Sequence, residues 1–438
     1  MTSVTRRTFL KRSAWAAASG AAASGAVAAG AAAGAEEMGA NDRITVGIIG
    51  CRNRGATVGS YMLRTGGVDV AAVCDCDDEM LDKALAEKLA PVADKIRREK
   101  DFRRLLDDKS LDAVVVATPD HWHAQMTVMA LDAGKHVYLE KPASFNIQDG
   151  KAMVAAQAKH PDRVVQVGTQ QRSGQHFMDA KAFIAEGGLG KVAFCRATFI
   201  TERHTVPVVA DSEPPAGLDY PMWIGPAPMR PYNVELLHYN WHFLYDFGTG
   251  DMGNWGAHWL DVLRWLLDLD LPTSAAAYGG QFVNRDAKEW PDTQTVLYQF
   301  PEMTLLWELR HWSRFMPGAG RGNCCEIDGD KGSMLIDRGG WKFYPRARDA
   351  EGHEHPPADL ELAHVRSFAA AVRGEAGPAA PIVEGHKSAI LCHLGNIAAR
   401  LNRSVQFDPA REAIVGDAEA EAMMGREYRA PWSLAPYV

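Results

Sequence analysis

Short apolar runs alternate with helix-patterned segments along the first part of the chain. The apolar runs are strand-like and lie at Thr45–Ile49, Val68–Cys74, Ala113–Ala117, His136–Leu139 and Val164–Val167. Between them, apolar residues recur at helical spacing over residues 55–65, 78–89 and 123–133. Strands that alternate with helices predict a parallel sheet with crossover helices, so we expect an α/β domain here.

The pattern changes in the second part of the chain. Strand-like runs now follow one another, at Ala193–Ile200, Ser274–Phe282, Thr293–Phe300, Met303–Leu309, Asn323–Gly329 and Ser333–Asp337. This succession predicts an α+β domain with an open, mostly antiparallel sheet and a few helices. Because the chain is too long for one ordinary core, we expect one domain over residues 36–160 and a second over residues 161–438.

Three other segments complete the organisation. Pro207–Asn240 is rich in proline and has little periodicity. It predicts a long ordered loop, a kind of segment that is often functional. Residues 363–401 show helical spacing, and we expect the tail beyond Phe407 to wrap a surface.

The first 35 residues have the features of an export signal. Arg6-Arg7 stands in Thr5–Lys11, an uncharged stretch rich in Ala and Gly follows, and a small-residue site lies at Ala33–Ala35. These features predict a cleaved twin-arginine signal peptide over residues 1–35 and a periplasmic or extracellular protein. The stretch is too weakly apolar for a stable membrane span, so no membrane association is expected after cleavage.

Charge and cysteine content narrow the class of protein. Cleavage removes four basic residues and no acidic one, which changes the formal charge from −8 to −12. An acidic chain argues against nucleic acid and anionic membrane as partners. The seven cysteines form no CxxC pair, and their odd number does not suggest a disulfide framework. This composition fits folding in the reducing cytosol before export.

A glycine-containing turn follows the first predicted strand. Gly50 and Gly55 flank Cys51, Arg52, Asn53 and Arg54. Such a turn presents backbone N–H groups and a helix N-terminus to a pyrophosphate. Arg52 occupies the place of the middle glycine of G-x-G-x-x-G, so the motif alone is weak.

Asp75 strengthens the nucleotide interpretation. It ends the second predicted strand 20 residues after Gly55. A carboxylate there accepts hydrogen bonds from an adenosine ribose and repels a 2′-phosphate, which favours NAD over NADP. The alternative is that Asp75 is a loop residue or a helix cap beside Asp77 and Asp78.

Two polar motifs stand at the carboxyl ends of later strands. They are Thr118–His123 and Glu140-Lys141-Pro142. Ligands bind at that edge of an open α/β sheet. An isolated lysine at a strand end is usually solvated, but beside a nicotinamide its ammonium can hydrogen-bond a substrate hydroxyl and help to move its proton.

These motifs together resemble the Gfo/Idh/MocA family, which includes glucose–fructose oxidoreductase and inositol dehydrogenase. The resemblance covers nearly all of the chain after the leader and continues through Gly168–Arg172, Trp223–Pro226 and Tyr239–Asp261. The later stretches are most similar to the exported, twin-arginine branch. The resemblance implies a Rossmann domain, a second domain whose open sheet faces the nicotinamide, often a cis peptide before Pro142, and sugar or cyclitol substrates.

The resemblance also implies the site residues. Cofactor contacts are expected from Gly50, Cys51, Arg52, Asn53, Arg54, Asp75, Thr118, Pro119, His123, Glu140, Lys141 and Gln170. By analogy, His258 takes the proton from the oxidised carbinol and Lys141 positions the oxygen; the alternative is a structural histidine in the domain interface. Substrate contacts are expected from Arg172, Tyr239, Trp241 and His242.

One position departs from the family pattern. The sugar dehydrogenases carry an Asp four residues before the histidine that matches His258, and here that residue is Asn254. A neutral amide can bind a hydroxyl, but it cannot act as a base. Asp251, one helical turn earlier, is a candidate substitute.

Histidines and aromatic residues are concentrated in the same region. His238 and His242 stand four residues apart, but no carboxylate or cysteine pattern completes a site, so no metal is expected. Aromatic rings stack on sugar faces and also fill cores. We expect Trp259 and Trp265 to lie in the core, and Tyr239 or Trp241 to lie nearer the ligand.

Export constrains the function. Free NAD should be scarce outside the cytoplasm, so we expect a tightly held cofactor that is recycled within each cycle. One hypothesis is a sugar oxidoreductase that reduces a second acceptor. Another is redox-neutral glycoside cleavage or epimerisation through a transient keto sugar, and a third is a non-catalytic sugar-binding protein. The open sheet suggests a homo-oligomer.

Overall fold

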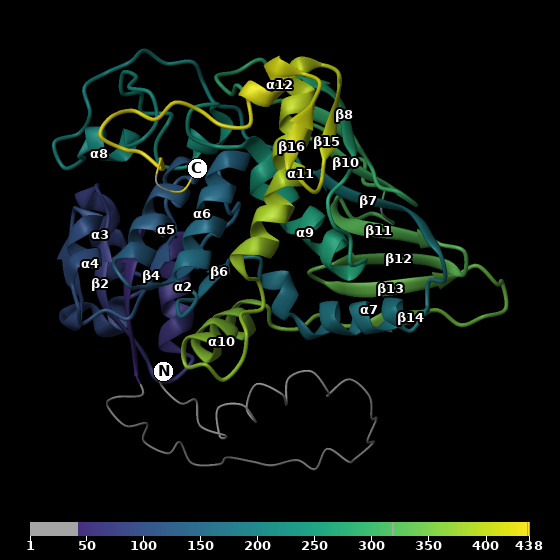
Figure 1. Cartoon of the computed structure of the whole chain (residues 1–438), viewed down its shortest axis with the longest axis horizontal. Helices are drawn as coiled ribbons and strands as arrows, with labels where there is room; N and C mark the ends of the chain where they lie inside the picture. The colour runs from purple at the N-terminus through teal and green to yellow at the C-terminus, as the bar shows by residue number, and fades with distance from the viewer. Residues whose placement is uncertain (1–42, 318, 436, 438) are drawn as a thin grey trace, which may run out of the picture. The chain divides into compact units, whose positions relative to one another are not determined.

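The computed structural model describes residues 43–438 except 318, 436 and 438 (Figure 1). The predicted signal peptide over residues 1–35 therefore lies outside the described residues. In the part of the chain that is described, no helix has both the length and the apolar character needed to cross a bilayer.

The N-terminal sheet is parallel and has six strands in the order β3-β2-β1-β4-β5-β6. The strands are β1 (Ile44–Ile49), β2 (Val68–Cys74), β3 (Arg97–Glu99), β4 (Ala113–Val116), β5 (His136–Leu139) and β6 (Val165–Val167). The helices are α2 (Arg54–Leu63), α3 (Asp78–Ala86), α4 (Phe102–Asp107), α5 (His123–Asp132) and α6 (Ile147–Lys159). The predicted α/β domain is confirmed, and its strand order reverses between β1 and β4, which is where such sheets bind ligands.

Two details of this sheet differ from the sequence pattern. The charged strand β3 gives no apolar signal, and the sequence analysis did not find it. β6 pairs with β5 although it follows residue 160, so the first sheet takes its last strand from the segment assigned to the second domain.

The second sheet has ten strands in the order β14-β13-β12-β11-β7-β10-β9-β8-β15-β16. They are β7 (Val192–Ile200), β8 (Ser274–Gly280), β9 (Thr293–Gln299), β10 (Thr304–Arg310), β11 (Asn323–Gly329), β12 (Gly332–Asp337), β13 (Gly340–Pro345), β14 (His353–His355), β15 (Ser404–Asp408) and β16 (Ala413–Val415). Only β7 and β10 pair in parallel among the pairings described. The predicted mostly antiparallel sheet is therefore confirmed, and the four strands that were not predicted lie at its two edges.

Helices cover one face of this sheet (Figure 1). They are α7 (Gln175–Ala185), α9 (Ala257–Leu266), α11 (Ile382–Leu401) and α12 (Ala418–Ala422), whereas α10 (Glu361–Val372) belongs with the first domain. Trp259 of α9 is 1% exposed and packs in the same core as Trp307 of β10, as expected, while Trp265 packs against that core half-buried. The opposite face carries Tyr278 and Leu297, which are 68% and 44% exposed.

The helical segment expected over residues 363–401 is two helices. Residues 373–381 separate α10 from α11 and contain two glycines and two prolines, which do not continue a helix. α10 packs on the first domain, since Val365 and Phe368 share a buried cluster with Val46 of β1 and Tyr138 of β5. The two domains thus interlock through α10.

The long loop and the C-terminal tail also return to the first domain. The loop contains the short helix α8 (Tyr220–Ile224), and Asp219 N donates to the carbonyl of Cys76, just after β2. In the tail, Arg429 N donates to the carbonyl of Pro226 and Trp432 packs edge-on against Trp122. The tail runs beside α8 at the upper left of Figure 1 and holds the loop from outside.

Candidate active site

The turn between β1 and α2 depends on its two glycines. Gly50 has a φ of +81°, and a Cβ there would lie 2.7 Å from the carbonyl oxygen of Ala117. A Cβ on Gly55 would lie 2.0 Å from the carbonyl oxygen of Gly50. The close approach of β1, α2 and the end of β4 therefore excludes side chains at both positions. No side chain caps the N-terminus of α2, so its first N–H groups are available to a phosphate.

A cavity of about 280 Å³ opens at this turn. Both domains contribute to its walls, because it includes the glycine turn, the ends of β2, β4 and β5, the long loop and the segment before α9. Predicted site residues that line it are Gly50, Arg52, Asn53, Arg54, Asp75, Thr118, Pro119, Glu140, Lys141, Tyr239, Trp241, His242 and Asn254. The structure thus gathers most of the predicted residues around one cavity.

Asp75 lies in the cavity wall at the end of β2. Its carboxylate accepts hydrogen bonds from Cys51 N (2.9 Å) and Asp77 N (3.2 Å). Burial raises the pKa of Asp75 despite these bonds. The helix-cap alternative belongs instead to Asp77, whose side chain accepts from Glu79 N at the start of α3. Asp75 is therefore free of a capping role and has the position expected of a ribose-binding carboxylate.

The end of the long loop closes over the glycine turn. Arg52 Nη1 donates to the carbonyl of His238 (3.0 Å), and its guanidinium lies over the ring of Tyr239. His238 Nε2 lies 2.7 Å from Asp77 Oδ2. Arg52 therefore ties the loop to the turn, which explains how an arginine is accommodated where a middle glycine is usual.

Lys141 follows β5 in the cavity wall and is held there by Asn254. Lys141 Nζ donates to Asn254 Oδ1 (2.8 Å) and to the Asn254 carbonyl (3.0 Å). Asn254 belongs to a π-helical turn, Met252–Gly256, and such turns are frequent at functional sites. Burial lowers the pKa of Lys141, against the opposing effect of Glu140 and Asp120. An amine with a neutral partner and a lowered pKa is suited to exchange a proton with a hydroxyl.

Asp251 orients Asn254 and does not reach Lys141 itself. Asn254 Nδ2 donates to Asp251 Oδ1 (3.0 Å), so the amide oxygen faces the lysine. Asp251 is fully buried and accepts two hydrogen bonds from Arg203 (2.6 and 2.8 Å), and His311 Nε2 lies 2.8 Å away. The contacts with His311 and Arg203 hold the pKa of Asp251 well below its usual range in spite of its burial. Asp251 is thus a fixed anion, and it is a positioning residue.

His258 lies one turn after Asn254, at the start of α9. It is 5% exposed, and its Nδ1 has no hydrogen-bond partner among the described residues. Burial, followed by the charges of Arg338 and Lys141, holds the pKa of His258 well below its usual value. The imidazole is therefore neutral and able to accept a proton, although it is not part of the cavity wall described above.

Several predicted cofactor residues support the wall from behind. The ring nitrogens of His123 lie 2.8 Å from the Pro142 carbonyl and 3.0 Å from the Thr118 carbonyl, and the Lys141–Pro142 peptide is cis, as expected. Cys51 is fully buried. Gln170 Nε2 donates to Glu361 (2.9 Å), a partner that it shares with Arg54. These residues hold the ends of β1, β4, β5 and β6 together.

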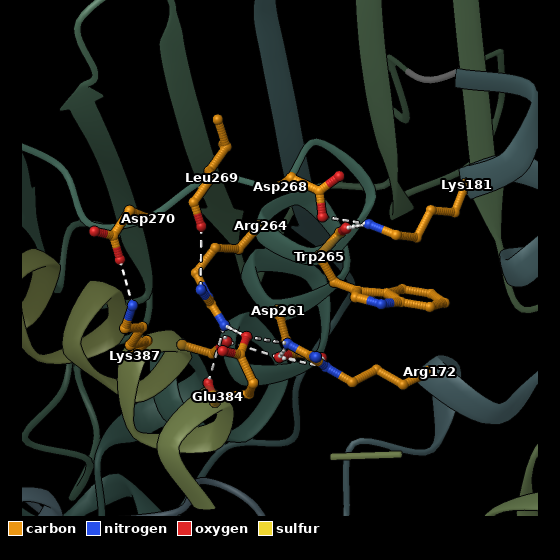
Figure 2. Close-up of polar contacts among 11 residues, drawn as sticks. Arg172, Lys181, Asp261, Arg264, Trp265, Asp268, Leu269, Asp270, Glu384 and Lys387 are labelled. Carbon is orange, nitrogen blue, oxygen red and sulfur yellow. Dashed lines mark hydrogen bonds and ion pairs between the residues drawn. The ribbon is translucent and has the colours of Figure 1, made fainter. Parts of the chain in front are cut away.

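Arg172 lies in a buried ionic network away from the cavity. Its guanidinium donates to both oxygens of Asp261 (2.8 to 3.1 Å), and its side chain is 4% exposed. Figure 2 shows this network extending to Glu384 and Arg264. The structure therefore does not bring Arg172 to the other expected substrate residues.

The residues that line the apolar half of the cavity were not among the predicted site residues. That half is lined by Phe102, Trp122, Met126, Met222 and Trp223, and Asp120 also lines the cavity. Asp120 and Trp122 stand at the carboxyl end of β4 within a motif that the sequence analysis singled out. Met222 and Trp223 come from the aperiodic loop, where the resemblance includes Trp223–Pro226 but no periodicity predicts a contact with the cavity.

The residues present fit a dinucleotide. The glycine turn leaves room for a pyrophosphate, Asp75 suits a ribose, and Thr118 Oγ1 is buried without a partner beside the cavity. Among the described residues, no group of three or more His, Cys, Asp or Glu side chains is arranged to hold a metal ion.

Two family models match the chain. One is described as an oxidoreductase family, NAD-binding Rossmann fold, and matches residues 44–169. The other is described as an oxidoreductase family, C-terminal alpha/beta domain, and matches residues 203–290 and 353–434. Together they cover more than half of the chain.

Curated relatives and solved structures agree with these matches. Inositol 2-dehydrogenase 2 of Saccharopolyspora erythraea is 28% identical over 53% of this chain and 56% of the relative. A glycosyl hydrolase family 109 protein of Shewanella pealeana is 30% identical over 25% of each chain. The chain thus spans a quarter to just over half of the length of these relatives.

A solved levoglucosan dehydrogenase, in complex with NADH and L-sorbose, has the same fold. Its TM-score is 0.65 at 17% identity, over 83% of this chain and 98% of the other. With the two family models, the strand order and the Glu140-Lys141-Pro142 motif, these similarities show that the chain belongs to the Gfo/Idh/MocA family of oxidoreductases and that its N-terminal domain is an NAD-binding Rossmann domain.

Proposed function

We propose that the chain is an exported NAD-dependent oxidoreductase that acts on a sugar or sugar derivative and retains its cofactor through each cycle. The observation that carries this proposal is the Lys141–Asn254 pair. It places a buried amine on the wall of the dinucleotide cavity, with both hydrogen bonds to Asn254 oxygens. Bound NAD supplies a hydride acceptor in such a site.

The chain's own residues handle the proton in this proposal. Lys141 holds the substrate hydroxyl, and neutral His258 takes the proton from it as the carbinol is oxidised. Asn254 cannot take a proton, so its role is to hold Lys141 in place. Asp120, 4% exposed and bound by Thr249 Oγ1 (2.7 Å), contributes negative charge near the amine.

Retention of the cofactor is supported by the covering of the cavity. Met222 and His238 of the long loop line it, and the loop is bonded to the first domain near β2. The tail holds the loop in turn through Arg429, which donates to the carbonyls of Gly225 and Pro221 (2.8 Å each). These bonds fix the loop beside the cavity, which favours slow release of a bound cofactor.

The proposal is tested by adding sugars to the purified protein and following the nicotinamide absorbance at a fixed enzyme concentration. The expected result is that the sugar reduces the bound NAD and that the reaction stops when one NADH has formed per enzyme molecule. An added ketose or another carbonyl acceptor should then reoxidise the NADH. If no sugar in a broad panel changes the absorbance of a cofactor-loaded protein, the oxidoreductase proposal is wrong.

Asn254 favours a second candidate, redox-neutral glycoside cleavage or epimerisation through a transient keto sugar. Asn254 stands next to Lys141 where the sugar dehydrogenases of the family have an Asp. This difference suggests that the chemistry after oxidation of the sugar also differs. A glycoside with a chromogenic leaving group tests it, because release of the chromophore without net reduction of the cofactor is expected from cleavage. If binding of sugars were intact and both assays failed, a non-catalytic sugar-binding protein would be favoured.

We also propose a homo-oligomer that uses the open face of the second sheet. Tyr278 and Leu297 are exposed on neighbouring strands of that face. Large exposed apolar side chains on an open sheet are typical of surfaces that are covered in an assembly. Sedimentation analysis of the parent and of a Tyr278→Lys, Leu297→Lys variant tests this proposal, and a parent that is monomeric would contradict it.

A further inference from the structure

His242 is a buried histidine in the wall of the cavity. It belongs to the short 3₁₀ helix Asn240–Phe243 at the end of the long loop, is 4% exposed, and lines the same cavity as Lys141. Its Nδ1 lies 2.5 Å from the carbonyl oxygen of Tyr239. Because a carbonyl oxygen only accepts hydrogen bonds, Nδ1 carries the hydrogen. Burial lowers the pKa of His242 to about 4, so the ring is neutral near neutral pH and its Nε2 is an acceptor.

The Nε2 atom of His242 has no hydrogen-bond partner among the described residues. Asp251 Oδ1 lies 3.9 Å away, but a carboxylate oxygen is also an acceptor. That oxygen already accepts hydrogen bonds from Arg203 Nη2 (2.6 Å) and Asn254 Nδ2 (3.0 Å). Asp251 therefore leaves the acceptor on His242 unsatisfied.

Other buried histidines show how such a ring is usually satisfied. Both ring nitrogens of His121 lie within 3.2 Å of a backbone carbonyl oxygen, and those of His123 lie within 3.0 Å of one. Buried ring nitrogens without a partner also occur outside the cavity wall, on His258, His311 and His386. Because an unsatisfied buried acceptor is costly, Nε2 of His242 is suited to accept a hydrogen bond from a molecule bound in the cavity.

His242 and Lys141 are linked by one chain of contacts. Nε2 of His242 and Nδ2 of Asn254 both lie near Oδ1 of Asp251. The oxygen of the same Asn254 amide accepts from Lys141 Nζ (2.8 Å), whose second hydrogen bond goes to the Asn254 carbonyl. An ammonium group has three donors, so one of them is left for a ligand. The wall thus presents a free donor and a free acceptor within one polar cluster.

The two free positions match a pair of hydroxyl groups. A hydroxyl accepts through its oxygen and donates one hydrogen, so one hydroxyl can accept from Lys141 while another donates to His242. A sugar carries several hydroxyls on one small ring, whereas an ether, keto or fluoro group has no hydrogen to donate. The nicotinamide carboxamide is a second source of a donor, and the affinity for the cofactor distinguishes it from a sugar hydroxyl.

We propose that His242 selects substrates with a second free hydroxyl, which donates to its Nε2 while the hydroxyl to be oxidised binds Lys141. The inference rests on the proposed function, since it narrows the substrate class of the same site. The preferred substrate is a sugar in which both hydroxyls are free, and a derivative that is methylated or deoxygenated at the second position should bind poorly. His242 is thus a specificity-determining residue.

Fluorinated sugars test this role without requiring turnover. The protein is loaded with NADH, so that no sugar is oxidised, and is titrated with the sugar that reduces its bound NAD and with analogues in which fluorine replaces one hydroxyl at a time. In the parent, loss of one hydroxyl other than the oxidised one is expected to weaken binding about 10-fold or more. In His242→Leu this difference should disappear, and His242→Gln, which offers an acceptor oxygen, should restore part of it. Exposed His353→Leu should behave like the parent.

The contrary outcomes are distinguishable. Equal binding of the sugar and of every fluorinated analogue, or the same preference in His242→Leu, overturns the hydroxyl proposal and leaves the oxidoreductase standing. Weaker NADH binding by His242→Leu with an unchanged sugar preference assigns the ring to the nicotinamide carboxamide and also overturns the proposal. If no sugar reduces the bound NAD, the proposed function is wrong and the hydroxyl proposal falls with it.

A measurement on the parent protein covers the case in which His242→Leu does not fold. At saturation with ligand, the ¹⁵N resonance of His242 Nε2 should shift toward that of a hydrogen-bonded nitrogen with the sugar, but not with the analogue that has lost the second hydroxyl. An identical resonance in the two complexes overturns the proposal.

Discussion

Two buried polar networks start from one short stretch of chain and differ in whether they are complete. Around Asp261, every charged group has an opposite charge: Arg172, Arg264 and Glu384 complete the set, and Ser388 donates to Asp261 as well (Figure 2). Around Asn254, the lysine has only a neutral amide for a partner. The first network lies away from the cavity, whereas the second forms part of its wall.

The difference teaches how to separate structural from functional charge in this fold. In the Asp261 network every charged group is paired within the protein. This network holds α9 against the residues around it and, among the residues described, has no unpaired group that could bind a ligand. A network that leaves an amine paired with a neutral amide can still bind a substrate through that amine. Substitutions should therefore affect stability in the first network and turnover in the second.

The largest expected effect is on turnover in Lys141→Ala. Loss of the amine that holds the substrate hydroxyl for proton transfer to His258 should lower kcat by about 10²- to 10⁴-fold. Bound NAD and the melting temperature should change little, because the amine bonds only to Asn254. Steady-state rates, nucleotide content and thermal unfolding measure the three quantities. Lys109→Ala, at an exposed position, is the control. Loss of the cofactor from Lys141→Ala would instead make the lysine structural.

The opposite profile is expected from Arg172→Ala. This change leaves Asp261 buried without its cation, which typically costs about 3–5 kcal/mol of unfolding free energy. The kcat of the protein that remains folded should be close to that of the parent, because Arg172 is not part of the cavity wall. Denaturant unfolding and active-site titration with stoichiometric nucleotide measure these two effects. If Arg172→Ala had normal stability and a much lower kcat, Arg172 would be a substrate-binding residue and not a structural one.

The pH dependence of the free energy of unfolding should show that His258 is neutral in the folded protein. The folded-state pKa of His258 is depressed, so the unfolded state binds more protons below about pH 6.5 and stability falls as the pH falls. The contribution approaches about 1.4 kcal/mol for each pH unit below that value. His258→Gln should remove this share of the pH dependence between pH 7 and pH 5, whereas exposed His353→Gln should not. Identical pH dependence in His258→Gln and the parent would show that His258 is not held neutral.

The smallest expected effect is a shift of the pH–rate profile in Asn254→Asp. A carboxylate beside Lys141 favours the charged amine and so raises the pKa of Lys141. The limb of the pH–rate profile that reports loss of a proton from Lys141 should therefore move up by about one pH unit or more. Asp251 lies 3.0 Å from the amide nitrogen and would limit the shift by repelling the new charge. The profile of kcat/KM measures the shift. An unchanged limb would indicate that this limb does not belong to Lys141.

Much of the fold could be predicted because it follows strong local patterns. The apolar strands of both sheets and the crossover helices have clear periodicity, whereas β3 and β14 are short and exposed or charged. Gly50, Asp75 and Lys141 could be found because each follows a predicted strand of a parallel sheet, and the carboxyl ends of such strands meet at one edge.

The remaining site residues depend on contacts that are distant in sequence. Arg172 and Lys141 are both cations near strand ends, and only the position of Asp261 distinguishes a closed ion pair from an open one. Met222 and Trp223 reach the cavity because Asp219 and Gly217 bond to the segment after β2, and no local pattern encodes that pairing. The position of the cavity and its polar residues could therefore be predicted from the sequence, whereas the residues that line its apolar half could not.

The central claim, a retained NAD in a working site, is tested most directly by the nucleotide content of the purified protein. The protein is passed through a desalting column, denatured, and the supernatant is assayed for NAD(H). The account predicts close to one nicotinamide nucleotide per chain, held under the loop and tail that cover the cavity. A protein that is empty and also fails to bind added NAD would contradict it.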